Sequence, residues 1–191
     1  MRILIWLASA CAACAQVEIH LSYGLLQNIV GAQVFTEDGR KYVKGSKQEK
    51  CTFAYLENPR IAEAGGKIEV RAKFSGRSAL NVFGQCVGVG DSFDATIRMT
   101  PYADKSTLRL KDIEVSGGPR PGLYARRVCK ALAETLPGVL IYDLGPDFKR
   151  ALEVEQPGVG YKKSVDGVAV RTVRVGKESL ILDLAFRLLL R

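Results

Sequence analysis

The chain has 191 residues, of which 28 are Lys or Arg and 20 are Asp or Glu, so its formal net charge is +8. This length is enough for one domain with a substantial core. The basic residues are scattered along the chain, which argues against nucleic acid as a partner. The positive charge favours contact with an anionic membrane surface; the alternative is that it only keeps the protein soluble.

The N-terminal segment has the three zones of a cleavable export signal. Arg2 supplies the positive start, an apolar run follows from Ile3 to Ala13, and Ala13-Cys14-Ala15 fits the small-x-small pattern that signal peptidase recognises. The run is too short to cross a hydrocarbon core of about 30 Å as a helix. We therefore predict a signal peptide at 1–15 and a single α+β domain at 16–191, exported to the periplasm or outer envelope. The alternative is that the run forms a buried strand.

A second pattern in the same segment indicates lipidation. Ala8-Ser9-Ala10-Cys11 approximates the bacterial lipobox, in which the cysteine is acylated, although Ala8 stands where leucine is usual. This alternative predicts a soluble domain anchored to a membrane through one lipid on Cys11.

The first element expected after the signal is a helix. Apolar residues recur at helical spacing between positions 21 and 34, and Ser22 is a suitable N-cap. Glu37-Asp38-Gly39 then predicts a turn, and a short strand is expected over 40–43.

The middle of the chain consists of predicted strands. A β-prone segment at 51–56 should be ended by Asn58-Pro59. Apolar and polar residues alternate strictly over 67–74 and 93–99, which predicts two strands with one apolar and one polar face. Pro101 is expected to close the second of them.

The alternation continues from 108 to 115 but shifts by one residue at Asp112, which predicts a β-bulge in a bent strand. A Gly- and Pro-rich turn then leads into a predicted helix over 123–136, which Pro137-Gly138 should stop. The two expected faces of this helix are Tyr124, Val128, Ala131, Leu132 and Thr135 on one side, and Arg126, Lys130 and Glu134 on the other.

The C-terminal part combines a short helix with a hairpin. Residues 139–144 fit no element, and a helix is expected from Gly145-Pro146 to about Glu153. Alternating β-branched residues over 168–175, with one shift, and apolar residues at every second position from 180 to 190 predict two strands. Their apolar face should pack on another part of the protein.

Three cysteines follow the predicted signal, namely Cys51, Cys86 and Cys129. An oxidising compartment permits one disulfide with one cysteine left over. Cys51 and Cys86 both lie near the ends of strand-like segments, so we favour this pair, with Cys129 as a small buried residue of the helix. The alternative is that no disulfide forms.

The order of these elements predicts an α+β fold in which a long, curved antiparallel sheet wraps around a long helix as a half-barrel. This order resembles the tubular lipid-binding (TULIP) superfamily, in particular small bacterial envelope proteins with a single half-barrel unit. The resemblance covers most of the chain after the signal and rests on architecture, since no signature residue is matched. The segments that carry it are LSYGLLQNIVGAQV, KIEVRAKF, FDATIRM, LRLKDIEVS, LYARRVCKALAETL and LILDLAFRLLL.

The resemblance implies a trough whose apolar inner wall holds acyl chains, without a cofactor. The residues that it places against a ligand are Ile68, Val70, Ala72, Phe74, Phe93, Ala95, Ile97, Met99, Val128 and Leu132. Three basic helix residues are expected at the mouth, facing an acidic head group: Arg126, Arg127 and Lys130. The alternative is that the same apolar residues fill a solid core.

Catalytic chemistry is not indicated. His20 is the only histidine and lies close to the predicted new N-terminus, so a Ser-His-Asp site, a Cys-His site and a His-based metal site are all disfavoured, and no Cys-x-x-Cys spacing occurs. Carboxylate pairs remain as candidates for acid and base work: Asp91, Asp94, Asp143 and Asp147.

Three functional hypotheses follow. The leading one is an exported, non-catalytic protein that binds a lipid or other apolar small molecule in a trough between sheet and helix. The second is a structural or protein-interaction module of the cell envelope without a ligand. The third is an envelope hydrolase that uses carboxylates. A cavity of several hundred Å³ would distinguish the first from the second.

Overall fold

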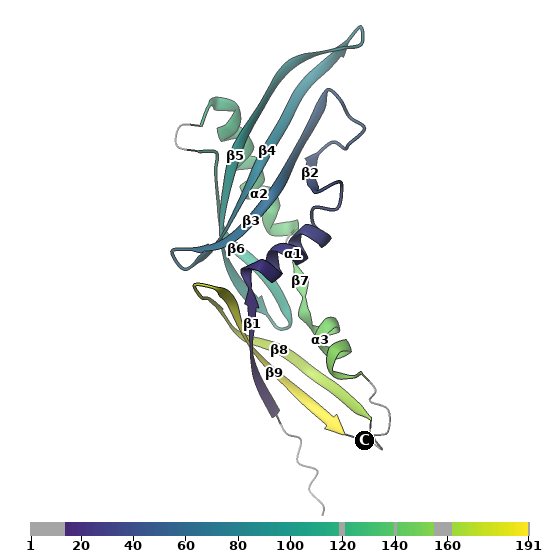
Figure 1. Ribbon diagram of the computed structural model, residues 1–191, viewed down its shortest axis with the longest axis vertical. Coiled ribbons are helices and arrows are strands. Elements are labelled where there is room, and N and C mark those ends of the chain that lie inside the picture. Colours follow the sequence, from purple (N-terminus) through teal and green to yellow (C-terminus); the bar gives the residue numbers. More distant parts are fainter. Residues whose placement is uncertain (1–13, 119–120, 140, 155–161, 191) are drawn as a thin grey trace, which may run out of the picture.

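The computed structural model describes residues 14–118, 121–139, 141–154 and 162–190. The molecule is elongated, with a large sheet at one end and a small sheet at the other (Figure 1). The large sheet contains, in spatial order, β2 (Arg40–Lys44), β3 (Thr52–Ala64), β4 (Lys67–Val82), β5 (Gln85–Asp104), β6 (Thr107–Ser116) and β7 (Tyr142–Asp143). The small sheet contains β1 (Cys14–Ser22), β9 (Ser179–Leu190) and β8 (Lys163–Val175), and the helices are α1 (Tyr23–Gln33), α2 (Leu123–Val139) and α3 (Leu144–Leu152).

Most of the predicted signal peptide lies outside the described residues, and so does Cys11. Strand β1 begins at Cys14 and pairs with β9 as far as Ser22. Cleavage after Ala15 would therefore leave the greater part of this strand, from Gln16 onward, in place on β9.

Strands β4 and β5 form the hairpin that contributes most of the sheet's apolar face. Their register places Phe74 opposite Phe93, and the two rings stack with centroids 4.8 Å apart. The predicted alternation is confirmed, because the apolar face is buried at Ile68, Ala72, Phe74, Ala95, Ile97 and Met99. Both strands extend beyond the predicted bounds, and they continue outward to a tight turn between Val82 and Gln85.

The prediction that Asn58-Pro59 and Pro101 end their strands is wrong. Strand β3 continues past Pro59 with a register shift after Glu57 and a φ of 54° at Asn58. Strand β5 continues through Pro101, which pairs with β6. In both places one side of the strand is free, because β2 pairs with β3 only up to Glu57 and β4 pairs with β5 only up to Met99. A proline, which lacks an N–H group, is tolerated at such half-paired positions.

The β-bulge predicted at Asp112 is confirmed. Arg98 pairs with Glu114 whereas Thr100 pairs with Lys111, so β6 has one residue more than β5 across this interval. Asp112 has a φ of 51°. The extra residue bends β6 and increases the twist of the sheet.

Each of the three predicted helices is present, with bounds within three residues of the predicted ones. Ser22 caps α1, since its hydroxyl accepts a hydrogen bond from the N–H of Leu25 at 3.3 Å. Asp143 caps α3 by accepting from the N–H of Gly145 at 3.0 Å. Helix α2 continues past Pro137 to Val139, contrary to prediction.

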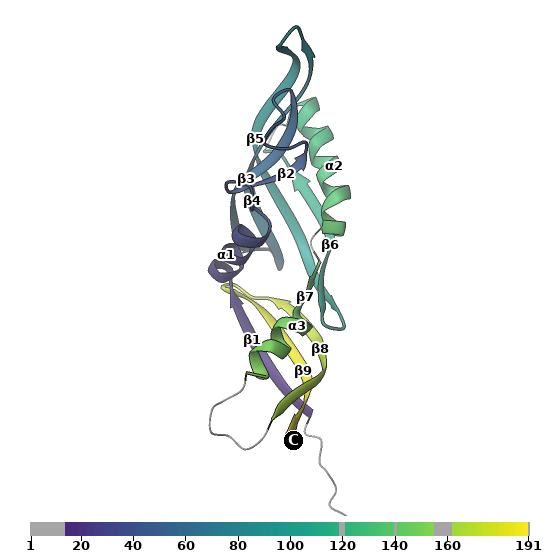
Figure 2. The same ribbon diagram turned by 90° about the vertical axis from the view of Figure 1, so that its right-hand side faces the viewer.

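The buried face of α2 is rotated from the predicted one. Ala125, Cys129, Leu132 and Leu136 are buried, whereas Ala131 and Thr135 are exposed. The helix lies along β6 and β5 of the large sheet (Figure 2). This rotation decides which basic residues of the helix face the groove described below.

The small sheet packs as the apolar alternation of β9 predicts. Leu180, Leu182, Leu184 and Phe186 are buried, and Phe148 of α3 meets the Phe186 ring edge-on at 5.0 Å. The two sheets touch where the N–H of Val170 donates to the carbonyl oxygen of Lys105 at 2.8 Å. A single apolar cluster includes residues from both sheets. The protein is thus an α+β fold built on a curled, antiparallel half-barrel sheet.

Candidate functional site

The first cavity of interest has a volume of about 300 Å³ and lies over the apolar face of the large sheet. Helix α1, strand β2 and helix α2 form its other walls. Its lining residues are Leu26, Val30, Val34, Phe35, Lys41, Tyr42, Val43, Leu56, Ile61, Ile68, Val70, Ile97, Met99, Leu110, Leu132, Thr135, Leu136 and Leu180. Nearly every one of these side chains is apolar, so this cavity suits a hydrocarbon better than a polar ligand.

Helix α1 forms one wall because its apolar residues repeat every four positions. Leu26, Val30 and Val34 therefore lie on one face, which points into the cavity. The helix is held at its start by Tyr23, whose hydroxyl donates to the carbonyl oxygen of Gly176 at 2.6 Å. Gln27 accepts a hydrogen bond from the N–H of Ile61 at 3.4 Å, which ties the helix to β3.

A second cavity of about 460 Å³ adjoins the first. The two share Val43, Leu132 and Thr135 as lining residues. The other residues of the second cavity are Lys44, Phe53, Ala54, Phe74, Arg77, Ser78, Val89, Tyr124, Arg127, Val128 and Ala131. We call the two cavities together the groove; it follows the sheet from α1 to the outer part of the β4–β5 hairpin.

Basic side chains are concentrated in the second cavity. Lys44, Arg77 and Arg127 line it, and Lys41 lines the first. Lys44, Arg77 and Arg127 are exposed, and they form no ion pair within the part of the chain that the structure describes. None of the described lining residues is acidic. The outer half of the groove therefore offers positive charge beside apolar walls.

Tyr124 contributes a hydroxyl group to the second cavity. Burial, with a contribution from the charge of Asp91, raises the pKa of Tyr124, which keeps its phenol protonated. A Cβ added at Gly76 would lie 2.9 Å from this hydroxyl and 2.8 Å from the Phe74 ring. Glycine at this position leaves room for the Tyr124 hydroxyl of α2 and for the Phe74 ring.

Most of the residues that the sequence placed against a ligand do line the groove: Ile68, Val70, Ile97, Met99 and Leu132 line the first cavity, and Phe74, Val128 and Leu132 the second. Ala72 and Ala95 are instead buried in the core, and Phe93 stacks on Phe74. The two alanine side chains are too short to reach the groove, and the Phe93 ring is directed against Phe74.

The three predicted head-group residues are not brought together. Arg127 lines the second cavity, whereas Arg126 and Lys130 line a separate hollow with Cys129 and the end of β6. Successive residues of a helix are about 100° apart, so neighbours such as Arg126 and Arg127 face different surroundings.

Several groove residues were missed by the sequence analysis. The helical repeat of Leu26, Val30 and Val34 was a usable signal for α1. Lys44 and Arg77 carry no such signal, because only the pairing of β2 with β3, the pairing of β3 with β4 and the packing of α2 bring them to one cavity.

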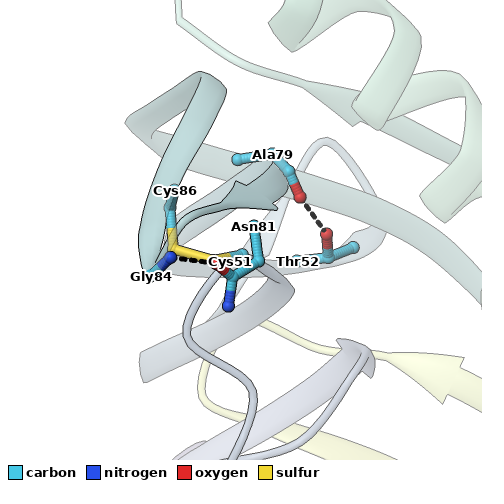
Figure 3. The surroundings of a disulfide bond; sticks show 6 residues. All are labelled: Cys51, Thr52, Ala79, Asn81, Gly84 and Cys86. Atoms are coloured by element: carbon cyan, nitrogen blue, oxygen red, sulfur yellow. Dashed lines mark hydrogen bonds between the residues drawn. A yellow bond between two sulfur atoms is a disulfide. The ribbon is translucent and has the colours of Figure 1, made fainter.

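The predicted disulfide is confirmed: Cys51 is bonded to Cys86, and Cys129 is free and buried. The bond ties the start of β3 to the β4–β5 hairpin (Figure 3). Beside it, the Thr52 hydroxyl donates to the carbonyl oxygen of Ala79 at 2.9 Å. Burial raises the pKa of the Cys129 thiol, so this residue acts as a core side chain rather than a reactive thiol.

Two of the four candidate carboxylates, Asp143 and Asp147, accept hydrogen bonds from neighbouring side chains. Asp143 caps α3 and accepts from the Ser106 hydroxyl at 2.7 Å, which holds the pKa of Asp143 below its usual value. Asp147 accepts from the Tyr142 hydroxyl. Asp91 and Asp94 are exposed on β5. In the described ranges, no three His, Cys, Asp or Glu side chains gather in a way that could hold a metal ion.

A buried carboxylate lies on the opposite face of the sheet. Glu69 is 3 % exposed and accepts hydrogen bonds from the Nε atoms of Arg71 at 2.7 Å and Arg98 at 2.8 Å. Burial alone would raise the pKa of Glu69, but the hydrogen bonds from Arg98 and Arg71, together with the positive charges of these residues, outweigh it and hold the pKa below the usual value. This cluster braces β4 against β5 from outside the groove.

Comparisons of the chain with protein-family models, with curated proteins and with solved structures gave no match. Over the described residues, no helix has both the length and the apolar character needed to cross a bilayer.

Proposed function

We propose that this is an exported, non-catalytic envelope protein that binds an amphiphile with an acyl chain and an anionic head group. The observation that carries the proposal is the groove, in which an almost wholly apolar cavity adjoins one bordered by Lys44, Arg77 and Arg127. The acyl chain would lie between α1 and the sheet, and the head group would face the three basic residues.

The energetics favour an elongated apolar ligand. Burial is worth about 0.8 kcal/mol per methylene, so about ten methylenes would contribute about 8 kcal/mol. Association costs several kcal/mol in lost freedom. Ion pairs with basic residues offset part of this cost, and we expect a dissociation constant in the micromolar range.

The proposal includes the finer architecture that the TULIP resemblance implies. In that arrangement the curled sheet and α2 act as the two sides of a trough, and α1 covers one end of it. The free cavity volume supports a trough over a solid core, because close-packed interiors leave few voids larger than a water molecule. The Cys51–Cys86 disulfide is compatible with export to an oxidising compartment.

The test is uptake of a fluorescent fatty acid by the mature protein, with native mass spectrometry to detect any lipid that co-purifies. Val30→Trp should fill the first cavity and reduce uptake by at least about tenfold, since it removes the space for several methylenes. Asn28→Trp, on the exposed side of the same helix, is the matched control and should leave uptake unchanged.

A bare mass together with no uptake by the unmodified protein would overturn the proposal. Equal loss of uptake in both tryptophan variants would also count against it, because the effect would then not come from the cavity. The hypothesis of an interaction module without a ligand would gain from the first result only.

A further inference from the structure

The outer end of the β4–β5 hairpin is an exposed apolar surface. Phe83 at the turn is fully exposed, and Leu80, Val87 and Val89 are 76 %, 60 % and 63 % exposed. Val82 is also exposed. From Ser78 to Gly90 the sequence contains no Asp, Glu, Lys, Arg or His. We call Leu80, Val82, Phe83, Val87 and Val89 the hairpin tip. Figure 1 shows that it projects furthest from the small sheet.

Turn geometry does not explain Phe83. Val82 pairs with Gln85, so the loop has two central residues, Phe83 and Gly84, with φ values of 49° and 83°. Two positive φ values are the pattern of a type I′ turn, which strongly prefers asparagine at the first position. A bulky aromatic there is strained and has no packing partner in the described chain. Its presence therefore indicates a role outside the folded chain.

The hairpin tip continues the apolar face of the groove. Side chains alternate between the two faces of a strand, and the register pairs Phe74 with Phe93, Ser78 with Val89, and Leu80 with Val87 on one face. Val89 itself lines the second cavity. An apolar surface thus extends from the groove to the end of the hairpin.

Basic residues lie next to this surface. The segment from the end of β2 to the start of β3 contains Lys44, Lys47 and Lys50 with Glu49 as its single acid, and Lys47 pairs with Asp38. The disulfide from Cys51 holds the end of this segment against the hairpin (Figure 3). Lysine side chains beside an uncharged apolar tip are complementary to an anionic membrane interface.

We propose that the hairpin tip docks on a bilayer that contains anionic phospholipid, with Phe83 and the flanking aliphatic residues inserted among the head groups and upper acyl chains. Lys44 and Lys50 would contact the phosphates. The inserted face leads to the groove, so the docked protein presents the second cavity to the membrane. This inference goes beyond ligand binding and does not require a lipid in the groove.

The test uses vesicles of phosphatidylcholine and phosphatidylglycerol in equal amounts. The chain's only tryptophan is Trp6, within the predicted signal peptide, so Phe83→Trp gives the mature protein a single reporter. Its emission should shift to shorter wavelength and become protected from a water-soluble quencher when vesicles are added. Val154→Trp, at an exposed apolar position in the Glu153–Val154 segment that follows α3, is the matched control and should do neither.

Phe83→Asn separates docking from folding. Asparagine suits the turn better than phenylalanine, so the variant should be at least as stable as the parent. Co-sedimentation with the vesicles should nevertheless weaken about tenfold, because the inserted ring is lost. High salt should also weaken binding.

Unchanged vesicle binding by Phe83→Asn, an emission of the Phe83→Trp variant that does not respond to vesicles, or no vesicle binding by the parent protein would each overturn the inference. Equal binding to pure phosphatidylcholine vesicles would overturn the role of the lysines. Fatty-acid uptake by the same Phe83→Asn protein should be unchanged, so failure of docking and failure of the groove remain distinguishable.

Discussion

Glu69 illustrates how a single buried charge braces the large sheet. Its carboxylate accepts from Arg71 on its own strand and from Arg98 on the neighbouring one. The desolvation cost of this carboxylate is offset only while both hydrogen bonds are present. Removing the charge should therefore weaken the β4–β5 pairing without touching the groove.

We expect Glu69→Gln to lower the free energy of unfolding by about 1–2 kcal/mol at neutral pH. Because the folded-state pKa is depressed, the stabilisation is present above the ordinary glutamate value of 4.5 and is lost as the pH falls through the folded pKa. Urea unfolding at a series of pH values should show the difference from the parent shrinking in acid. Glu114→Gln, at an exposed ion pair with Lys67, should have a smaller effect. A difference independent of pH would contradict the assignment.

The basic residues of the second cavity provide a second prediction at this scale. Arg77→Gln and Arg127→Gln together should weaken binding of a fluorescent fatty acid about tenfold, because two charge-assisted contacts are lost. Binding of the corresponding uncharged ester should change little. Arg126→Gln with Lys130→Gln is the matched control, because these residues face the hollow on the other side of α2. An equal loss in both pairs would argue for a general charge effect.

Among the elements, the β4–β5 hairpin is the most unusual. The close approach of its two strands requires glycine at position 88, where a Cβ would lie 2.3 Å from the Ser78 carbonyl oxygen. The pairing of β3 with β4 ends at Thr52, the first residue of β3, which lies opposite Ser78. The outer part of the hairpin extends beyond this pair. Beyond the point where the β3–β4 hydrogen bonds end, the Cys51–Cys86 disulfide attaches the hairpin to the start of β3.

Replacing Cys51 and Cys86 by serine should accelerate amide hydrogen exchange over residues 78–90 and lower the free energy of unfolding by about 2–4 kcal/mol, because the cross-link closes a loop of 35 residues. Exchange in α1 should be unaffected. Cys129→Ala is the control for loss of a cysteine as such and should leave exchange in the hairpin unchanged. Normal protection of the hairpin without the disulfide would show that the strand ladder suffices.

In the whole molecule, the groove lies between the apolar face of the small sheet and the apolar β4–β5 hairpin. The small sheet contributes Leu180 to the first cavity, and the hairpin contributes Val89 to the second. The residues that line the groove thus extend from the junction of the two sheets toward the hairpin tip. An amphiphile bound with its head group near Arg127 would lie with that end toward the hairpin tip.

Elements that depend on neighbouring residues along the chain could be predicted from the amino-acid sequence. Alternation set the faces of β4, β5 and β9, and the shift at Asp112 located the bulge. Ser22 located the start of α1. The Cys51–Cys86 pair followed from two cysteines at strand ends. Prolines were misleading, because whether a strand tolerates one depends on how many neighbours it has at that position.

The position of the groove and the charges that border it depend on how the helices and sheets pack together. The rotation of α2 about its own axis places Arg127 in the second cavity and Arg126 in the separate hollow. Strand pairing brings Arg77 and Lys44 to the cavity that Arg127 lines. These residues are distant in sequence, and their proximity comes from the curl of the sheet and the packing of α2. A pattern of neighbours along the chain specifies faces and turns, but it does not specify which faces meet or whether the space between them is filled.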